Sequence, residues 1–280
     1  MKKGLIWLVV MLFMSMLPVG MAQAEEGTSS DTASEKSFSV LLLGVDTGDL
    51  GRIEQGRSDV MQIMTVNPSE QHITLSSIPR DTYVNIPGYY MDKINHAYAF
   101  GGVELSKATV EEWLGITIDN YVVVNMSGLK EIVDAVNGIT VVPPTSFSIG
   151  GYDFVEGVET RLDGEAALAY SRERYTSGGD YARQGRQREV IEAVMKEAVN
   201  PAVLANLPQL LNAFSDNIDT DLDLMDMLSL FTKYANSDYT VDNYQFTGEG
   251  AMIDGIYYEM IYDSSYTEIL GYIKADLQVE

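Results

Sequence analysis

The chain has 280 residues, a formal net charge of −23, two histidines and no cysteine. The length fits one large domain or two small ones, and a hydrophobic share of 46% supports a substantial core and argues against bulk disorder. The acidic charge disfavours nucleic-acid binding. The lack of cysteine excludes disulfides, thiolate nucleophiles and cysteine metal sites, and two histidines are too few for most multi-histidine metal sites.

The first 24 residues carry the features of an export signal. Two lysines precede an apolar run, Leu5–Val19, and Ala22-Gln23-Ala24 then provides an A-x-A cleavage site. We predict that residues 1–24 form a signal peptide; the alternative is an uncleaved single-pass membrane anchor with its lysines inside the cell. Either way, the rest of the chain would be secreted or held at the outer face of the cytoplasmic membrane. Residues 25–36, rich in small, hydroxyl and acidic side chains, are expected to form a flexible spacer.

Beyond the spacer, strand and helix patterns alternate. The clearest unit is a hairpin, in which Val60–Val66 and His72–Ser77 flank the turn Asn67-Pro68-Ser69-Glu70. Further strands are predicted at Phe38–Leu43, Tyr121–Asn125, Ile139–Val142 and Tyr239–Phe246. Helices are predicted at Leu105–Trp113, Ser127–Val136 with Ser127 as N-cap, Glu165–Tyr170 with Asp163 as N-cap, Arg183–Val199, Pro201–Phe214, Leu224–Tyr234 and Ser264–Leu277. We therefore predict an α/β fold for residues 37–280, a single domain with a central mixed β-sheet and helices on both faces.

Charged residues gather where the hairpin strands begin and end. Asp46 follows the first buried strand, Arg57 and Asp59 precede the second, and Arg80 follows the third. Antiparallel pairing makes Arg57, Asp59 and Arg80 predicted neighbours, and Asp46 joins them if its strand is adjacent. Two close carboxylates repel unless a cation lies between them, and Mg²⁺ favours hard oxygen ligands and often shares its shell with phosphate. Arginine offers planar pairs of donors to phosphate oxygens, so the cluster predicts a phosphate site; a turn aspartate and a local ion pair are the competing explanations.

A second cluster holds five of the nine arginines. Arg172 and Arg174 leave a predicted helix and point the same way only if the chain there is extended. The next predicted helix begins among five polar residues: Asp180, Arg183, Arg186, Gln187 and Arg188. Cations at a helix N-terminus oppose its dipole unless an anion is bound, so this cluster too indicates an anion site. The competing explanation is salt bridges that balance the acidic surface, and it applies more strongly to Arg186 and Arg188.

Six segments between residues 40 and 191 match one family in order and spacing. They are LLLGVD (41–46), GRSDVM (56–61), SIPRDTYV (77–84), KINHAYAFGG (93–102), LDGEAALAYSRERY (162–175) and GGDYARQGRQREVI (178–191). Taken together, they resemble the LytR-CpsA-Psr family of cell-envelope glycopolymer phosphotransferases. The resemblance implies a three-layer α-β-α sandwich outside the membrane, with a long apolar pocket that holds a polyprenyl chain.

By motif position, the resemblance also implies roles for individual residues. Asp46 and Asp59 would bind Mg²⁺, with Mn²⁺ as the alternative ion. The pyrophosphate would be bound by five arginines, with lesser contributions from Lys93 and Gln187. These arginines are Arg57, Arg80, Arg172, Arg174 and Arg183. Arg80, Asp180 and Arg183 would take part in catalysis, with Asp180 as a candidate base or orienter for the acceptor hydroxyl.

We therefore predict a Mg²⁺-dependent extracytoplasmic transferase. It would move a phospho-linked glycopolymer, such as teichoic acid or capsular polysaccharide, from a polyprenyl pyrophosphate carrier to peptidoglycan. Its partners would be the lipid-linked glycan, the peptidoglycan acceptor and the membrane surface, and no nucleic acid. Two alternatives stay open: a non-catalytic protein that binds polyprenyl phosphate or anionic glycan, and a polyprenyl-pyrophosphate hydrolase. The presence of Asp46, Asp59 and Asp180 together favours catalysis over binding alone.

Overall fold

A computed structural model of the chain describes residues 36–47, 56–174, 178–198, 203, 217–222 and 239–279. They belong to one compact unit, Glu35–Glu280, which is described by itself. The predicted signal peptide, the spacer up to residue 35, the helix Leu224–Tyr234 and all but one residue of the helix Pro201–Phe214 lie outside the described residues. Within the described part of the chain, we find no helix whose length and apolar character would let it cross a membrane.

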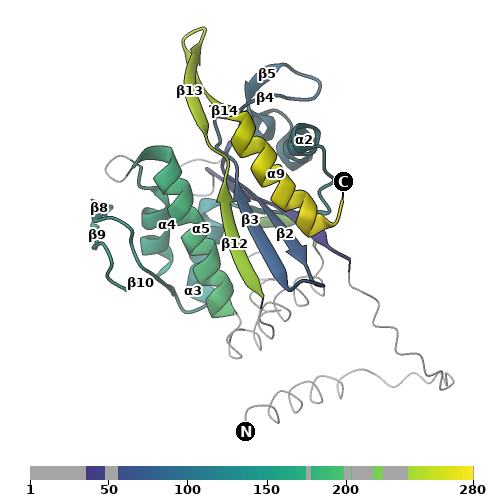
Figure 1. Cartoon of the computed structure of the whole chain (residues 1–280). Coiled ribbons are helices and arrows are strands. Elements are labelled where there is room, and N and C mark those ends of the chain that lie inside the picture. Colours follow the sequence, from purple (N-terminus) through teal and green to yellow (C-terminus); the bar gives the residue numbers. More distant parts are fainter. Residues whose placement is uncertain are drawn as a thin grey trace, which may run out of the picture. The chain divides into compact units, whose positions relative to one another are not determined.

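A six-stranded mixed sheet lies at the centre of the unit, in the order β11-β6-β1-β2-β3-β12 (Figure 1). Its strands are β1 (Phe38–Val45), β2 (Ser58–Asn67), β3 (His72–Ser77), β6 (Asn120–Val124), β11 (Ile218–Thr220) and β12 (Thr240–Gln245). The strands β1, β2 and β3 pair antiparallel, as the predicted hairpin requires. In contrast, β6 is parallel to β1 and β12 is parallel to β3, so the sheet is mixed, as predicted.

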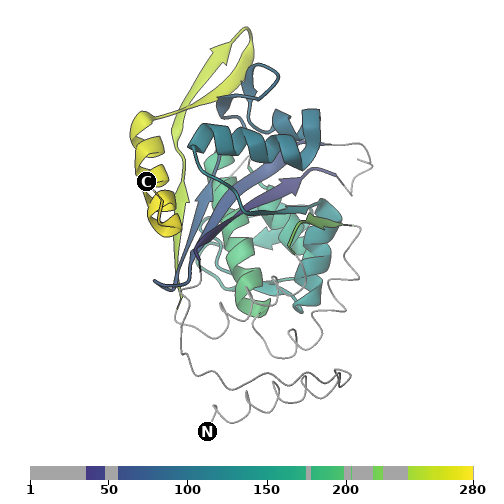
Figure 2. The same ribbon diagram turned by 90° about the vertical axis from the view of Figure 1, so that its right-hand side faces the viewer.

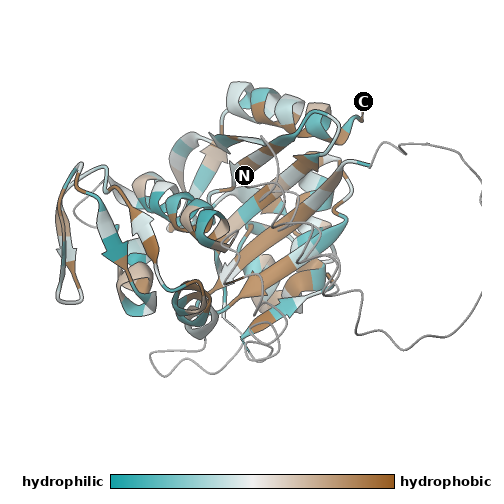
Figure 3. Ribbon diagram, turned by 90° about the horizontal axis from the view of Figure 1, so that it is seen from below, coloured by the Kyte–Doolittle hydropathy of each residue, from teal (hydrophilic) through white to brown (hydrophobic). Residues whose placement is uncertain are grey.

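Both faces of the sheet are covered by helices because its strands are apolar on both sides. On one face, Leu41 and Ile63 belong to a core with α2 (His96–Leu114) and α9 (Asp263–Leu277). On the other face, the core around Val40, Met64 and Leu75 is packed by residues of α5 (Gly179–Ala198). Figures 1 and 2 show α2 and α9 on one side and α3 (Met126–Ala135), α4 (Gly164–Arg172) and α5 on the other. Figure 3 shows the apolar residues along the central strands, and the predicted α-β-α layering is confirmed.

A second, smaller core joins α3, α4 and α5 to short strands. The strands form two hairpin-like pairs, β7 (Ile139–Val141) with β10 (Thr160–Leu162) and β8 (Phe147–Ile149) with β9 (Tyr152–Phe154). The predicted cap of α4 is confirmed, since Asp163 accepts a hydrogen bond from the backbone N of Ala166 at 2.9 Å. The predicted cap of α3 is wrong: Asn125 rather than Ser127 is the N-cap, and it accepts from the N of Gly128 at 2.8 Å.

Two helices begin several residues earlier than predicted, and three hairpins were not predicted, one of them the β8–β9 hairpin described above. The helix α2 begins at His96 and bends at Gly101 and Gly102, whose backbone angles are not helical. Because this break interrupts the helical pattern of apolar residues, the sequence did not predict the first turns. The helix α5 begins at Gly179 rather than at Arg183. The other two unpredicted hairpins are β4 (Tyr83–Asn85) with β5 (Met91–Lys93), and β13 (Gly248–Ile253) with β14 (Ile256–Ile261). They pack together through a bridge between Thr82 and Glu259, and their position borders the site described next.

Candidate active site

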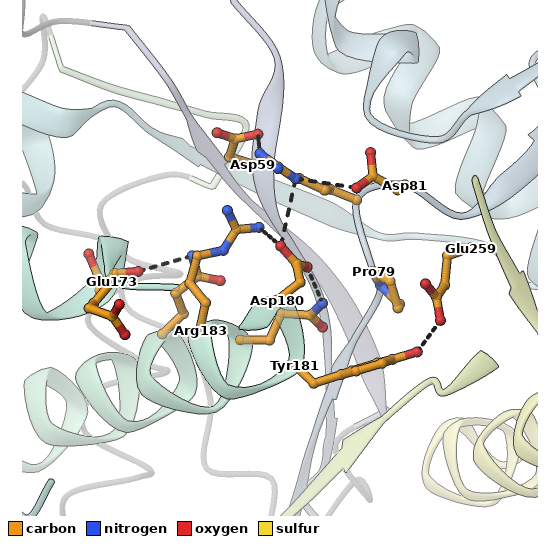
Figure 4. A network of polar contacts seen from close by, with 12 residues as sticks. Asp59, Pro79, Asp81, Glu173, Asp180, Tyr181, Arg183 and Glu259 are labelled. Atoms are coloured by element: carbon orange, nitrogen blue, oxygen red, sulfur yellow. Dashed lines mark hydrogen bonds and ion pairs between the residues drawn. The ribbon is translucent and has the colours of Figure 1, made fainter. Parts of the chain in front are cut away.

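Arg80 lies just beyond the end of β3, among three carboxylates. Its Nη1 donates to Asp59 Oδ1 at 2.7 Å, so the contact predicted from hairpin pairing is confirmed. Its Nε lies 3.7 Å from Asp81 Oδ2 and 3.8 Å from Asp180 Oδ1. Figure 4 labels Asp59, Asp81 and Asp180 and marks these three contacts with dashed lines. Burial lowers the pKa of Arg80, but the three negative charges outweigh burial and raise it, so Arg80 is a permanent cation.

Arg183 is the second cation of the site and is almost fully buried, with 6% of its side chain exposed. Its Nη2 lies 2.6 Å from Asp180 Oδ1 in an ion pair, but this contact is not aligned as a hydrogen bond. Burial lowers the pKa of Arg183; Asp180 opposes this shift and the neighbouring Arg80 adds to it. The buried Arg183 and the partly buried Arg80 therefore lie close to each other, an arrangement that an anion would stabilise.

Several buried donors of these two arginines have no hydrogen-bond partner within the described residues. They are Nε of Arg80 and both Nε and Nη2 of Arg183. Buried donors in proteins are almost always paired, because an unpaired one costs about 1–3 kcal/mol. The arrangement therefore fits a ligand that brings acceptor oxygens to this place.

Asp46 and Arg57 hold each other through the backbone. Asp46 Oδ1 accepts from the N of Arg57 at 2.7 Å, and Asp46 N donates to the carbonyl of Arg57 at 3.2 Å. A Cβ at Gly56 would clash with the Asp46 carboxylate, so glycine permits this close approach. Pairing of β1 with β2 places Asp46 at the same sheet end as Asp59. Arg57 is exposed, and the hydrogen bonds that the structure gives it are made by its backbone. Among the described residues, the predicted neighbours Arg57 and Arg80 therefore have no side-chain contact with each other.

The other arginines of the second cluster fall into two groups. Arg172 is the last residue of α4 and is exposed, and the chain becomes extended only at Glu173, so the condition under which Arg172 and Arg174 would point the same way is not met. Arg174 lies close enough for its charge to lower the pKa of Arg183, so it belongs to the site. Arg186 is fully buried and pairs with Glu173 Oε2 at 3.3 Å, which confirms the salt-bridge explanation for Arg186.

Two weaker candidates also lie near the cluster. Lys93, at the end of β5, pairs with Asp81 Oδ1 at 2.8 Å, and through Asp81 it connects to Arg80. Gln187 lies one turn beyond Arg183, is buried, and donates to the carbonyl of Ser171 at 3.4 Å. Its Oε1 has no hydrogen-bond partner within the described ranges.

Sequence reasoning missed a carboxylate network that supports the site. Asp81 joins Arg80 to Lys93, and the buried Glu259 of β14 accepts hydrogen bonds from Tyr181 and, at 2.6 Å, from Tyr257. Figure 4 shows Tyr181, next to Asp180 on α5, reaching Glu259. Asp81 lies in the SIPRDTYV segment next to Arg80 and could have been singled out. Glu259 had no such signal, because it comes 178 positions later within an unpredicted strand.

A sequence model of the LytR_cpsA_psr family matches residues 18–274. The chain belongs to this family. Among LytR-CpsA-Psr relatives, it is 47% identical over 249 residues to the polyisoprenyl-teichoic acid–peptidoglycan teichoic acid transferase TagU of Enterococcus faecalis, covering 88% of this chain and 82% of that protein. It is 38% identical over 243 residues to TagU of Bacillus subtilis, covering 86% and 78%.

Solved LytR-CpsA-Psr structures share the fold. TagT bound to LIIa-WTA superposes with a TM-score of 0.75 at 33% identity, covering 88% of this chain and 92% of that one. TagT with bound octaprenyl pyrophosphate lipid gives a TM-score of 0.70 at 32% identity, with the same coverage. The family and fold predicted from the six segments are therefore confirmed.

Proposed function

We propose that this chain is an extracytoplasmic transferase that moves a phospho-linked glycopolymer from a polyprenyl pyrophosphate carrier to peptidoglycan. The TagU relatives are named as transferases of this kind, for teichoic acid, and TagT has been solved with a polyprenyl pyrophosphate lipid. In this proposal, residues 1–24 direct export, and the unit beyond the spacer acts at the outer face of the membrane. We also propose that an apolar pocket of this unit holds the polyprenyl chain of the carrier.

The observation that carries the proposal is a pair of neighbouring guanidinium groups that have buried donors without a hydrogen-bond partner among the described residues. Arg80 and Arg183 share Asp180 as a common carboxylate partner, at 3.8 Å and 2.6 Å. Their unpaired Nε donors and buried positive charge match a diphosphate, which brings several acceptor oxygens and negative charge. The exposed Arg172 and the half-buried Arg174 extend the positive charge away from this pair.

The mechanism that we propose follows from this charge arrangement. A sugar hydroxyl of the acceptor attacks the glycan-side phosphorus and a new O–P bond forms, while the bond to the lipid phosphate breaks and the hydroxyl proton passes to the departing phosphate. The negative charge that spreads over the phosphorus oxygens is stabilised by Arg80 and Arg183, which are already in place before the reaction. Asp180 pairs with Arg183 through Oδ1 and accepts from Gln184 through Oδ2 at 3.0 Å. These contacts favour Asp180 as an orienter of the arginines over Asp180 as the base.

The carboxylates at the sheet end fit a hard divalent cation. The described residues contain no group of three or more metal-ligating side chains. Two carboxylates, Asp46 and Asp59, would therefore hold Mg²⁺ or Mn²⁺ together with phosphate oxygens and water, as Mg²⁺ sites commonly do. The close approach that Gly56 permits holds the Asp46 carboxylate against the Gly56–Arg57 backbone, at the sheet end where Asp59 also lies. Such a cation would neutralise charge on the diphosphate while Arg80 keeps Asp59 in position.

A reconstituted assay tests the proposal. Purified protein would be incubated with polyprenyl-pyrophosphoryl glycan and a peptidoglycan oligosaccharide, with Mg²⁺ present or replaced by a chelator. We expect Mg²⁺-dependent appearance of glycan on the oligosaccharide. Release of free phosphorylated glycan without transfer would show a hydrolase instead. Tight lipid binding without turnover would show a binding protein.

A further inference from the structure

An exposed tyrosine beside the arginine cluster has no role in the mechanism above. Tyr257 of β14 is 44% exposed, although the next two residues of the strand, Tyr258 and Glu259, are buried. Its ring lies against Gly250 of β13, where any Cβ would come within 2.6 Å of the ring. The glycine therefore lets the side of the ring that carries Cε2, Cζ and the hydroxyl lie close to the hairpin backbone, while Tyr257 remains 44% exposed.

The hydroxyl of Tyr257 is anchored to the framework of the site. It donates to Glu259 Oε2 at 2.6 Å, while Glu259 also accepts from Tyr181 and donates its backbone N to the carbonyl of Asp81 at 2.8 Å. The hydrogen bond to Glu259, with burial and the charges of Asp81 and Asp180, raises the pKa of Tyr257 to about 12. The hydroxyl thus remains a donor, and the ring is held at two places, over the glycine and at its hydroxyl.

The ring lies next to the cationic cluster. Lys93 Nζ lies 6.0 Å from the centre of the Tyr257 ring and 2.8 Å from Asp81 Oδ1. Asp81 in turn lies 3.7 Å from Arg80. A molecule bound at the arginines therefore has a fixed, half-exposed aromatic surface beside it.

We propose that Tyr257 is a stacking platform for a pyranose ring of the substrate and fixes the sugar whose phosphate or hydroxyl enters the arginine cluster. This rests on the proposed function, in which both donor and acceptor carry sugars next to the reacting atoms. A pyranose has a face of C–H groups that packs on an aromatic ring, while its hydroxyls stay available for polar contacts.

The test compares three variants in ligand binding. Tyr257→Ala removes the ring, Tyr257→Phe keeps the ring without the hydroxyl, and Tyr262→Ala removes a tyrosine of similar exposure, 46%, just beyond the same strand. The probes are polyprenyl pyrophosphate with and without an attached N-acetylglucosamine, and a peptidoglycan oligosaccharide. We expect Tyr257→Ala to weaken binding of a sugar-bearing probe by up to about tenfold, as loss of an aromatic contact would. Binding of the sugar-free lipid should be unchanged, and Tyr257→Phe and Tyr262→Ala should stay within about twofold of wild type.

The two sugar-bearing probes separate the sources of the pyranose. Weakening confined to the lipid-linked sugar assigns the platform to the donor, and weakening confined to the oligosaccharide assigns it to the acceptor. Unchanged binding of both probes by Tyr257→Ala overturns the proposal. The proposal is also overturned if Tyr257→Phe loses as much binding affinity as Tyr257→Ala and melts at a lower temperature. The side chain would then serve only to hold the hairpin. A wild-type protein that binds sugar-bearing probes more tightly but transfers nothing would refute the transferase and leave the platform intact.

Discussion

Replacing Arg80 with lysine separates the geometry of this side chain from its charge. The guanidinium donates to Asp59 from Nη1 at 2.7 Å, while its buried Nε has no aligned partner and faces Asp81 and Asp180 at 3.7 Å and 3.8 Å. A lysine ammonium can keep one of these contacts as a point charge, but it cannot present two donors in a plane. Losing one transition-state contact costs about 3 kcal/mol, or about a hundredfold in rate. We therefore expect Arg80→Lys to lose about this much turnover while its melting temperature stays close to wild type.

The assay is turnover with polyprenyl-pyrophosphoryl glycan and a peptidoglycan oligosaccharide, run beside a thermal melt. Arg161→Lys is the matched control, because Arg161 is 48% exposed and pairs with Glu197 at 2.6 Å outside the cluster. It should keep wild-type turnover. Arg80→Ala should be slower than Arg80→Lys, and it should also melt earlier, because three carboxylates would lose their common cation. If Arg80→Lys stayed fully active and Arg80→Ala lost only stability, Arg80 would be a structural ion-pair partner and our reasoning would be refuted.

Three further results are expected. Asp46→Asn should need about tenfold more Mg²⁺ for half-maximal turnover, as loss of a carboxylate ligand predicts, and an unchanged Mg²⁺ titration would remove Asp46 from the cation site. Burial lowers the pKa of His72, but its hydrogen bonds with Asp276 at 2.6 Å and Asp242 at 3.2 Å outweigh burial and raise the pKa. The stability that His72 adds is therefore fully present below its unfolded pKa of about 6.5, and it is lost as the pH rises through the folded pKa. Melting temperatures from pH 6 to pH 9 should therefore fall further for wild type than for His72→Gln, whereas parallel curves would contradict this. Amino-terminal sequencing of the exported protein should find Glu25 first, whereas recovery of the initiator methionine in the membrane fraction would show an uncleaved anchor.

The contacts that sequence could predict are those set by local pairing. The Arg80–Asp59 contact follows from the hairpin, because strand register fixes which residues lie opposite one another just beyond the paired region. The cap at Asp163 follows from its position before a helical pattern. Ser127 failed as a cap because Asn125, two residues earlier, already supplies the side-chain oxygen, and both residue types suit that role.

The contacts that sequence could not predict depend on distant strands or on side-chain direction. Glu259 meets Tyr181 only because the β13–β14 hairpin packs beside α5, and no local pattern encodes that contact. Arg57 donates its backbone N to the Asp46 carboxylate, a detail that motif position does not reveal. No role was predicted for Glu173, which lies between two arginines, although the buried Arg186 requires an acidic partner and pairs with it.

The order of strands in the sheet has a consequence for how the chain can be shortened. The four inner strands come from residues 38–124, whereas the described edge strands β11 and β12 come from residues 218–245. A chain that stops before residue 218 would therefore leave β6 and β3 with unpaired backbone donors and acceptors along apolar strands, which is the template on which chains aggregate. In the full-length chain, β12 covers β3 and presents the exposed, polar Asp242 and Asn243 instead. The last quarter of the sequence thus completes the sheet and covers the strands on which chains would otherwise aggregate.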